Sequence, residues 1–122
     1  MPFKIIKIPT FKDSRGQLSV LDGILPFDVK RTYWIYNTDG SVRGGHRHHQ
    51  TRQALVALSG TVEIFMDDGQ ECETIFLDRP DKALIVEPKD WHTMTFSSNS
   101  ILLVFSSHPY NINDYIDEPY AK

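Results

Sequence analysis

Three histidines lie close together in the segment RGGHRHHQTRQ, residues 43–53. His46 and His48 are two residues apart, so on a β-strand both imidazoles point to one face, while Arg47 and His49 point to the other. Imidazole titrates near neutral pH, so a pair on one face can transfer a proton or bind a metal ion. The two glycines before His46 permit backbone conformations that are closed to other residues.

A fourth histidine, His92, follows a proline-containing turn in the segment PKDWHTM. With His46 and His48 it could complete a three-imidazole site of the kind that suits Zn, Fe or Ni. The next ligand would be Gln53, a neutral amide that does not offset the charge of a divalent cation. Proton transfer without a metal is therefore the favoured interpretation. A polar barrel mouth without function is disfavoured, because inward polar groups are costly unless they are used or paired.

The elements that must position these side chains are short strands separated by turns. Runs rich in β-branched and aromatic residues recur at short spacing and are bounded by Gly, Pro, Asn and Asp. This pattern of short strands and turns predicts an all-β, antiparallel sandwich or barrel, with one short helical turn in the tail. The expected strands are KIIKI, QLSVL, KRTYWIY, RGGHRHH, QALVALS, TVEIFM, ETIFL, ALIVEP, TMTFSS and ILLVFSS.

Length and composition set the broad class. The chain has 122 residues, which predicts one domain over residues 1–122. Its net charge of −3 argues against a nucleic acid polymer as partner. Cys72 is the single cysteine, so an internal disulfide is impossible. No apolar run approaches the roughly 18 residues of a membrane span, and no signal-peptide core opens the chain, so we expect a cytoplasmic protein without a membrane partner.

The spacing around the histidines resembles the first motif of the cupin superfamily. Gly40, His46, His48, Gln53 and Gly60 are separated by the five, one, four and six residues of that motif. Metal-binding cupins carry Glu where this chain has Gln53. The segment PKDWH resembles the second motif more loosely, since it is one residue short and has Asp for Gly.

Further fragments resemble one cupin branch, the WxcM-like dTDP-4-keto-6-deoxyglucose 3,4-ketoisomerases. These are DSRGQL, KRTYWIYNTDG, RGGHRHHQTRQ, DDG and WHTM, in order and at similar spacing. The resemblance implies a jelly-roll barrel, a homodimer that exchanges strands, no metal and no cofactor. It also implies a substrate, a dTDP-linked 4-keto-6-deoxy sugar whose ketone moves from C4 to C3 for surface-glycan or metabolite synthesis. Arg47 departs from the small residue usual between the two histidines, but it faces away from them.

Such a reaction is a tautomerisation through an enediol, which needs a base, a proton relay and a hydrogen-bond donor for the developing oxyanion. The resemblance makes His46 the base that takes the C3 proton. His48, on the same face, is the second catalytic candidate, as relay or as orienter, and Tyr33 is expected to donate the hydroxyl proton or to bind the oxyanion. Arginine is suited to bidentate binding of the nucleotide phosphates. The expected substrate-binding residues are Arg15 and Arg43, both beside glycines, then Gln53 and His92, with Arg31 and Arg52 as weaker arginine candidates.

Two alternatives use the same fold. A cupin 3,5-epimerase acts on the same sugar nucleotide, but such chains are longer and use a His–Asp pair whose context is not found here. A metal-dependent cupin oxygenase or small-molecule sensor would need a metal ligand in place of Gln53 or an added DNA-binding domain.

Overall fold

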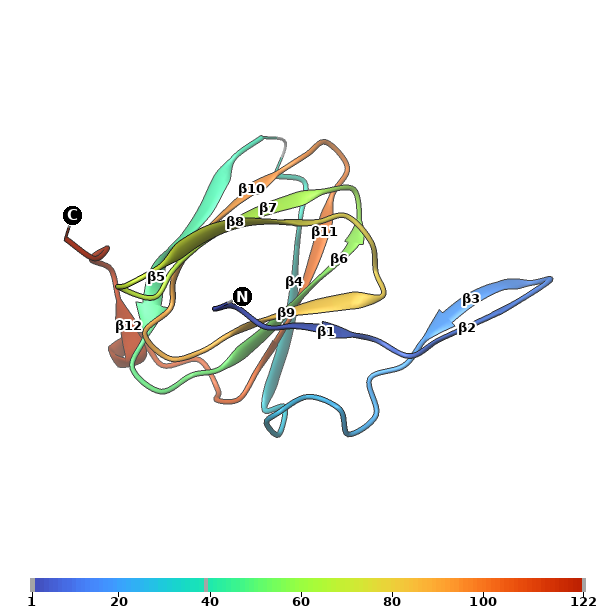
Figure 1. The fold of residues 1–122 in the computed structure, drawn as a ribbon, viewed down its shortest axis with the longest axis horizontal. Helices are drawn as coiled ribbons and strands as arrows, with labels where there is room; N and C mark the ends of the chain where they lie inside the picture. The colour runs from blue at the N-terminus through green and yellow to red at the C-terminus, as the bar shows by residue number, and fades with distance from the viewer. Residues whose placement is uncertain (1, 39, 122) are drawn as a thin grey trace.

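Two five-stranded sheets pack face to face in the computed structural model, which describes residues 2–38 and 40–121. The first sheet contains, in spatial order, β1 (Ile5–Lys7), β9 (Lys82–Val86), β6 (Gln53–Ser59), β11 (Ile101–Ser106) and β4 (Arg31–Tyr36). The second contains β12 (Tyr115–Ile116), β5 (Val42–His48), β10 (Trp91–Phe96), β7 (Val62–Asp67) and β8 (Cys72–Leu77). All their pairings are antiparallel, and Figure 1 shows the two sheets enclosing a barrel.

The predicted all-β class is therefore confirmed. The tail carries one short helical turn, the 3-10 helix η1 (Ile112–Asp114), where the sequence suggested a turn. Two strands were not predicted. One is β12, and the other is β2 (Thr10–Asp13), which pairs with β3 (Gly16–Ser19) as a hairpin. Figure 1 shows this hairpin extending away from the barrel.

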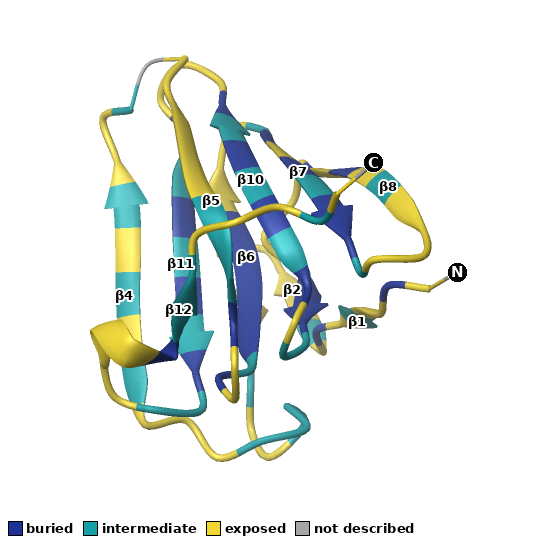
Figure 2. Cartoon of the chain, turned by 90° about the vertical axis from the view of Figure 1, so that its left-hand side faces the viewer, coloured by how far each residue is buried: buried dark blue, intermediate teal, exposed yellow. Residues whose placement is uncertain are grey.

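Most of the barrel interior is an apolar core between the sheets. Strands β10 and β11 alternate regularly between buried and half-buried residues (Figure 2), because successive side chains point to opposite faces. The inward residues from the two sheets form one cluster. Its largest fully buried members are Leu55, Ile64, Met66, Leu77, Leu84 and Leu102.

The interior becomes polar at one end of the barrel, and strand register explains why. Ser106 of β11 is opposite both Gln53 of β6 and Arg31 of β4. On the other sheet, His92 of β10 is opposite His46 of β5. The polar residues therefore come from the ends of strands that meet at the same place, next to the apolar core. None of the helices in the described part of the chain is long and apolar enough to cross a membrane.

Candidate active site

Three imidazoles and one phenol pack together at the polar end. The ring centroid of His46 lies 4.9 Å from that of His48, 4.8 Å from that of His92 and 4.7 Å from that of Tyr115. His48 and His92 are buried, whereas His46 is half-buried, so His46 is the imidazole that an incoming molecule can reach. The predicted same-face placement of His46 and His48 is confirmed, and His49 is exposed as expected.

The ring of His46 packs edge to face against the other two imidazoles. The planes of His46 and His48 are 80° apart, and those of His46 and His92 are 74° apart. Within residues 2–38 and 40–121, no group of three or more His, Cys, Asp or Glu side chains is arranged to hold a metal ion. The position where a metal-binding cupin has Glu holds Gln53, whose amide contacts two hydroxyl groups instead. Gln53 therefore supplies no charge at this position to offset that of a divalent cation.

Burial makes these imidazoles weak bases. It lowers the pKa of His46, against the opposing effects of the Gly44 backbone and Asp117. Burial, with the neighbouring His46, lowers the pKa of His48 to about 4 and that of His92 to about 3. All three are therefore neutral at pH 7, the form in which an imidazole accepts a proton.

The hydrogen bonds of the buried imidazoles differ in a way that separates their roles. Nδ1 of His92 lies 3.1 Å from the backbone oxygen of Asp90, so the neutral ring donates its proton there and is fixed in place. Nδ1 of His48 is buried and has no hydrogen-bond partner among the described residues. A buried polar atom without a partner costs free energy, so the ring of His48 lacks the hydrogen bond that fixes the ring of His92.

A β-bulge sets the relation between Arg43 and the histidines. The pairing of β10 with β5 shifts between His92 and Thr93, at Gly44 and Gly45, both of which have positive φ angles of 80° and 75°. Because of this shift, Arg43 is opposite the core residue Met94, while His46 is opposite His92. Directly opposed residues share a sheet face, so Arg43 and His46 lie on the inner face although their spacing is odd.

Tyr33 and Gln53 form a second part of the site. Tyr33 is half-buried on the inner face of β4, and its hydroxyl accepts a hydrogen bond from Nε2 of Gln53 at 3.3 Å. The other Nε2 hydrogen of Gln53 goes to Oγ of Ser106 at 3.0 Å. Burial raises the pKa of Tyr33, so the phenol keeps its proton at pH 7. Since its oxygen accepts from Gln53, that proton is free to be donated elsewhere.

The arginines divide into engaged and free groups. The guanidinium of Arg31 stacks 4.3 Å from the ring centroid of Tyr33 and 5.3 Å from that of Tyr110. It has no ion pair among the described residues, and it lines a small pocket with His48 and Gln53. Arg52 is instead occupied by Glu87, at 2.7 Å, and by the Pro26 carbonyl, so this weaker candidate is not available.

Arg15 is not brought to the histidines of its own chain. It is at the tip of the projecting β2–β3 hairpin (Figure 1), is exposed, and pairs with Asp13 at 2.6 Å. Tyr115, in contrast, lies at the centre of the site and was not predicted. Its signal in the sequence is weak, because it belongs to a two-residue strand in a polar tail.

Comparison with known proteins gives a family match and a similar relative for this chain. Residues 1–121 match the family described as FdtA: WxcM-like, C-terminal. The chain is 39% identical to the TDP-4-oxo-6-deoxy-alpha-D-glucose-3,4-oxoisomerase of Aneurinibacillus thermoaerophilus, over 95% of this chain and 86% of the relative.

Two solved structures of 3,4-ketoisomerases are also similar to this chain. A histidine-to-asparagine mutant of the 3,4-ketoisomerase QdtA from Thermoanaerobacterium thermosaccharolyticum, solved with TDP-4-keto-6-deoxyglucose, is 34% identical. It matches with a TM-score of 0.91 over 95% of this chain and 87% of that one. The WlaRB TDP-quinovose 3,4-ketoisomerase from Campylobacter jejuni is 36% identical, also with a TM-score of 0.91, over 96% and 93%.

Proposed function

Since the chain belongs to the family FdtA: WxcM-like, C-terminal, we propose that the histidines at the polar end of its barrel carry out the reaction of its relatives. The chain is an isomerase of dTDP-sugars, a 3,4-ketoisomerase that converts dTDP-4-keto-6-deoxyglucose to a dTDP-3-keto-6-deoxyhexose. The single observation that carries the proposed mechanism is the packing of half-buried His46 against the buried ring of His48.

The chemistry is an exchange of protons and bonds within the sugar. A base takes the proton from C3, and the electrons of that C–H bond form a C3=C4 double bond while the C4 carbonyl pair moves to O4. The O3 proton then passes to O4, O3 becomes the new carbonyl, and C4 receives a proton. Oxidation at C3 equals reduction at C4, so the step is balanced without an outside oxidant or reductant.

In the proposed mechanism His46 is the base for the C3 proton. It is neutral at pH 7 because burial lowers its pKa, and it is the accessible member of the cluster. His48 lies on the same face with its ring packed against that of His46, which suits a second catalytic group that relays the proton between O3 and O4 or orients His46. A positioned general base typically contributes about 100-fold to 10,000-fold in rate.

Tyr33 supplies a hydrogen bond to the enediolate oxygen. The hydroxyl oxygen of Tyr33 accepts from Gln53, so its proton points away from Gln53 and can be donated to the substrate. Gln53 thus acts through Tyr33, because both of its amide hydrogens are already bound to protein hydroxyls. His92, bonded to Asp90, supports the ring of His46 from the core side.

The nucleotide diphosphate needs cations, and the proposal assigns Arg43 and Arg31. Arg43 shares the inner face with His46, and Arg31 holds an unpaired guanidinium between two aromatic rings near His48. Arg15 lies on a hairpin that points away from its own barrel, so in this proposal it serves the site of a partner subunit.

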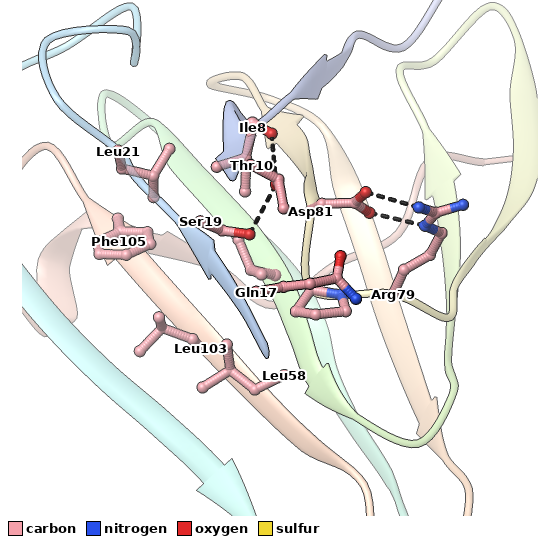
Figure 3. A pocket seen from close by; sticks show the side chains of 12 residues that line it. Ile8, Thr10, Gln17, Ser19, Leu21, Leu58, Arg79, Asp81, Leu103 and Phe105 are labelled. Atoms are coloured by element: carbon pink, nitrogen blue, oxygen red, sulfur yellow. Dashed lines mark hydrogen bonds and ion pairs between the residues drawn. The ribbon is translucent and has the colours of Figure 1, made fainter. Parts of the chain in front are cut away.

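That partner is a second copy of the chain. A cavity of about 760 Å³ lies between the hairpin and the outer face of the first sheet (Figure 3), and its walls include Leu58, Leu103 and Phe105. Leu58 is 45% exposed, and Phe11 and Leu18 on the hairpin are 66% and 59% exposed. Exposed apolar surface of this kind typically marks a protein interface. These features support the homodimer with exchanged strands that the family resemblance implies.

Two smaller proposals complete the assignment. Residues 1–122 form a single domain, supported by a family match that runs through residues 1–121. The protein acts in the cytoplasm, supported by an exposed, free Cys72 that a reducing compartment would preserve.

The test is to incubate the purified, metal-analysed protein with dTDP-4-keto-6-deoxyglucose in D2O and to follow the sugar by NMR. We expect a ketone at C3, deuterium at C4 and turnover that does not depend on a metal. Exchange at C3 and C5 without migration of the ketone would replace the proposal with 3,5-epimerisation. No exchange, together with a stoichiometric metal, would contradict both sugar reactions.

A further inference from the structure

The C-terminal segment, residues 110–121, crosses the polar end of the barrel and is attached to it at several points. The buried carboxylate of Asp114 accepts hydrogen bonds from the backbone N–H groups of Gln50, at 2.9 Å, and Thr51, at 3.2 Å. The Thr51 hydroxyl also donates to it. The backbone oxygen of Asp114 accepts from the N–H of His49 at 2.9 Å. This group of bonds fixes the segment to the turn that directly follows the histidine strand.

The same attachment places the next residue on the histidines. Tyr115 is opposite His48 in the pairing of β12 with β5. Its ring centroid lies 4.7 Å from that of His46 and 4.8 Å from that of His48. One aromatic side chain thus contacts both imidazoles that the proposed mechanism uses.

The far end of the segment is held separately. The guanidinium of Arg47 donates from Nε to the Glu118 carbonyl at 3.1 Å and stacks 4.0 Å from the ring centroid of Tyr120. The Tyr120 hydroxyl donates to the Lys89 carbonyl at 2.8 Å. Tyr120 therefore anchors the segment, and none of the ring contacts within the described part of the chain joins it to His46 or His48.

We propose that Tyr115 is a positioning residue for the ketoisomerase reaction, whose ring holds the imidazoles of His46 and His48 in the orientation that proton transfer requires. This inference rests on the proposed function of the histidine pair. Proton transfer depends steeply on geometry, and a displacement of about 1 Å can cost on the order of 100-fold in rate. The ring also keeps water from the imidazoles, which preserves their neutral form.

The test compares Tyr115→Leu, which removes the ring, with Tyr115→Phe, which keeps it. We expect Tyr115→Leu to lower kcat by about tenfold to 100-fold while KM changes by less than about threefold. Tyr115→Phe should restore kcat to within about threefold of the parent, because the ring and not the hydroxyl carries the role. Tyr120→Leu is the matched control, since it loosens the same segment without touching the histidines, and it should keep kcat within about threefold.

The acidic limb of the kcat profile is a readout that a merely structural role would not move. In Tyr115→Leu this limb should shift toward higher pH, because water then reaches the imidazoles. The charged and titratable groups facing the pair are Arg31 from β4, His92 from β10, and Asp114 and Asp117 from the C-terminal segment, and the variant keeps all of them. If Tyr115→Leu does not fold, Tyr115→Met, a flexible side chain of similar length, takes its place.

A kcat within twofold of the parent in the folded ring-less variant would overturn the inference. So would an equal loss in Tyr115→Phe, which would assign the role to the hydroxyl, or an equal loss in Tyr120→Leu, which would assign it to the segment. The His46→Asn variant, measured in the same assay, separates this inference from the proposed function. If His46→Asn is inactive, the proposed function is supported even when the inference about Tyr115 fails. Active His46→Asn would contradict the proposed function itself.

Discussion

The side chains of the site are tuned by burial more than by charge. His46, His48 and His92 pack with one another, and burial is the largest cause of the lowered pKa of each. Tyr33 is shifted in the opposite direction, because burial disfavours the phenolate. The result at pH 7 is a set of neutral bases beside a neutral hydrogen-bond donor, which is the combination that enolisation needs.

The pH dependence of activity follows from His46. Its pKa is lower than the ordinary value of about 6.5, so the base stays unprotonated until the pH falls below that value. We therefore expect the acidic limb of kcat/KM to have its midpoint below pH 6.5. Measuring kcat/KM between pH 4.5 and 8 checks this, and a midpoint above 6.5 would show that His46 is not the group that must be neutral.

Replacing Gln53 with Glu should damage catalysis through Tyr33. A carboxylate has no hydrogen to give, so the Tyr33 hydroxyl would donate to it and its proton would no longer face the substrate. We expect kcat to fall by roughly 100-fold with little change in KM, as for the loss of one oxyanion donor. Ser106→Ala is the control, since it removes the other partner of Gln53 and leaves the Tyr33 contact intact. A Gln53→Glu enzyme with the parental kcat would refute this role.

At the scale of elements, the strand pattern was readable from the sequence but two placements were not. Strands such as β10 and β11 were expected, because TMTFSS and ILLVFSS are short runs rich in strand-forming residues and are separated by turn residues. The bulge at Gly44 and Gly45 depends on how β5 pairs with β10, so strand parity alone does not reveal that Arg43 and His46 share a face. Likewise Tyr115 reaches the site through the hydrogen bonds of Asp114 and not through a local pattern.

The bulge predicts a specific sensitivity at Gly44. A Cβ there would lie 2.9 Å from the His92 carbonyl oxygen, and the residue has φ of +80°. Gly23, in an exposed loop, has φ of +68° with no atom within 4 Å of an added Cβ. Gly23→Ala should thus cost only backbone strain, about 1 kcal/mol, whereas Gly44→Ala should destabilise more and also lower kcat. Urea unfolding of both variants measures the difference, and equal losses of stability would contradict the close packing at the bulge.

At the scale of the whole molecule, part of the apolar surface of a single barrel remains exposed. The hairpin projects from the barrel, and the outer face of the first sheet carries exposed side chains. Neither feature was evident from the sequence, since the strand before the hairpin turn was not predicted and exposure depends on how the sheets pack. A second copy that covers this face would explain both.

This arrangement predicts which surface substitutions affect assembly. Leu58→Glu places a charge beside the cavity on the outer face of the first sheet, so it should weaken the homodimer at least tenfold. Phe76→Glu is the matched control, because Phe76 is 55% exposed on β8 of the other sheet. Sedimentation equilibrium measures both dissociation constants. A monomeric parent protein, or equal weakening by the two substitutions, would rule out the proposed interface.

The most direct test of the account is the His46→Asn variant, assayed for turnover of dTDP-4-keto-6-deoxyglucose in D2O by NMR. The account predicts that migration of the ketone and deuterium entry at C4 fall by at least about 100-fold. Circular dichroism and the melting temperature should stay close to those of the parent, which shows that the fold survives. Near-normal turnover in the folded variant would contradict the claim that His46 moves the proton.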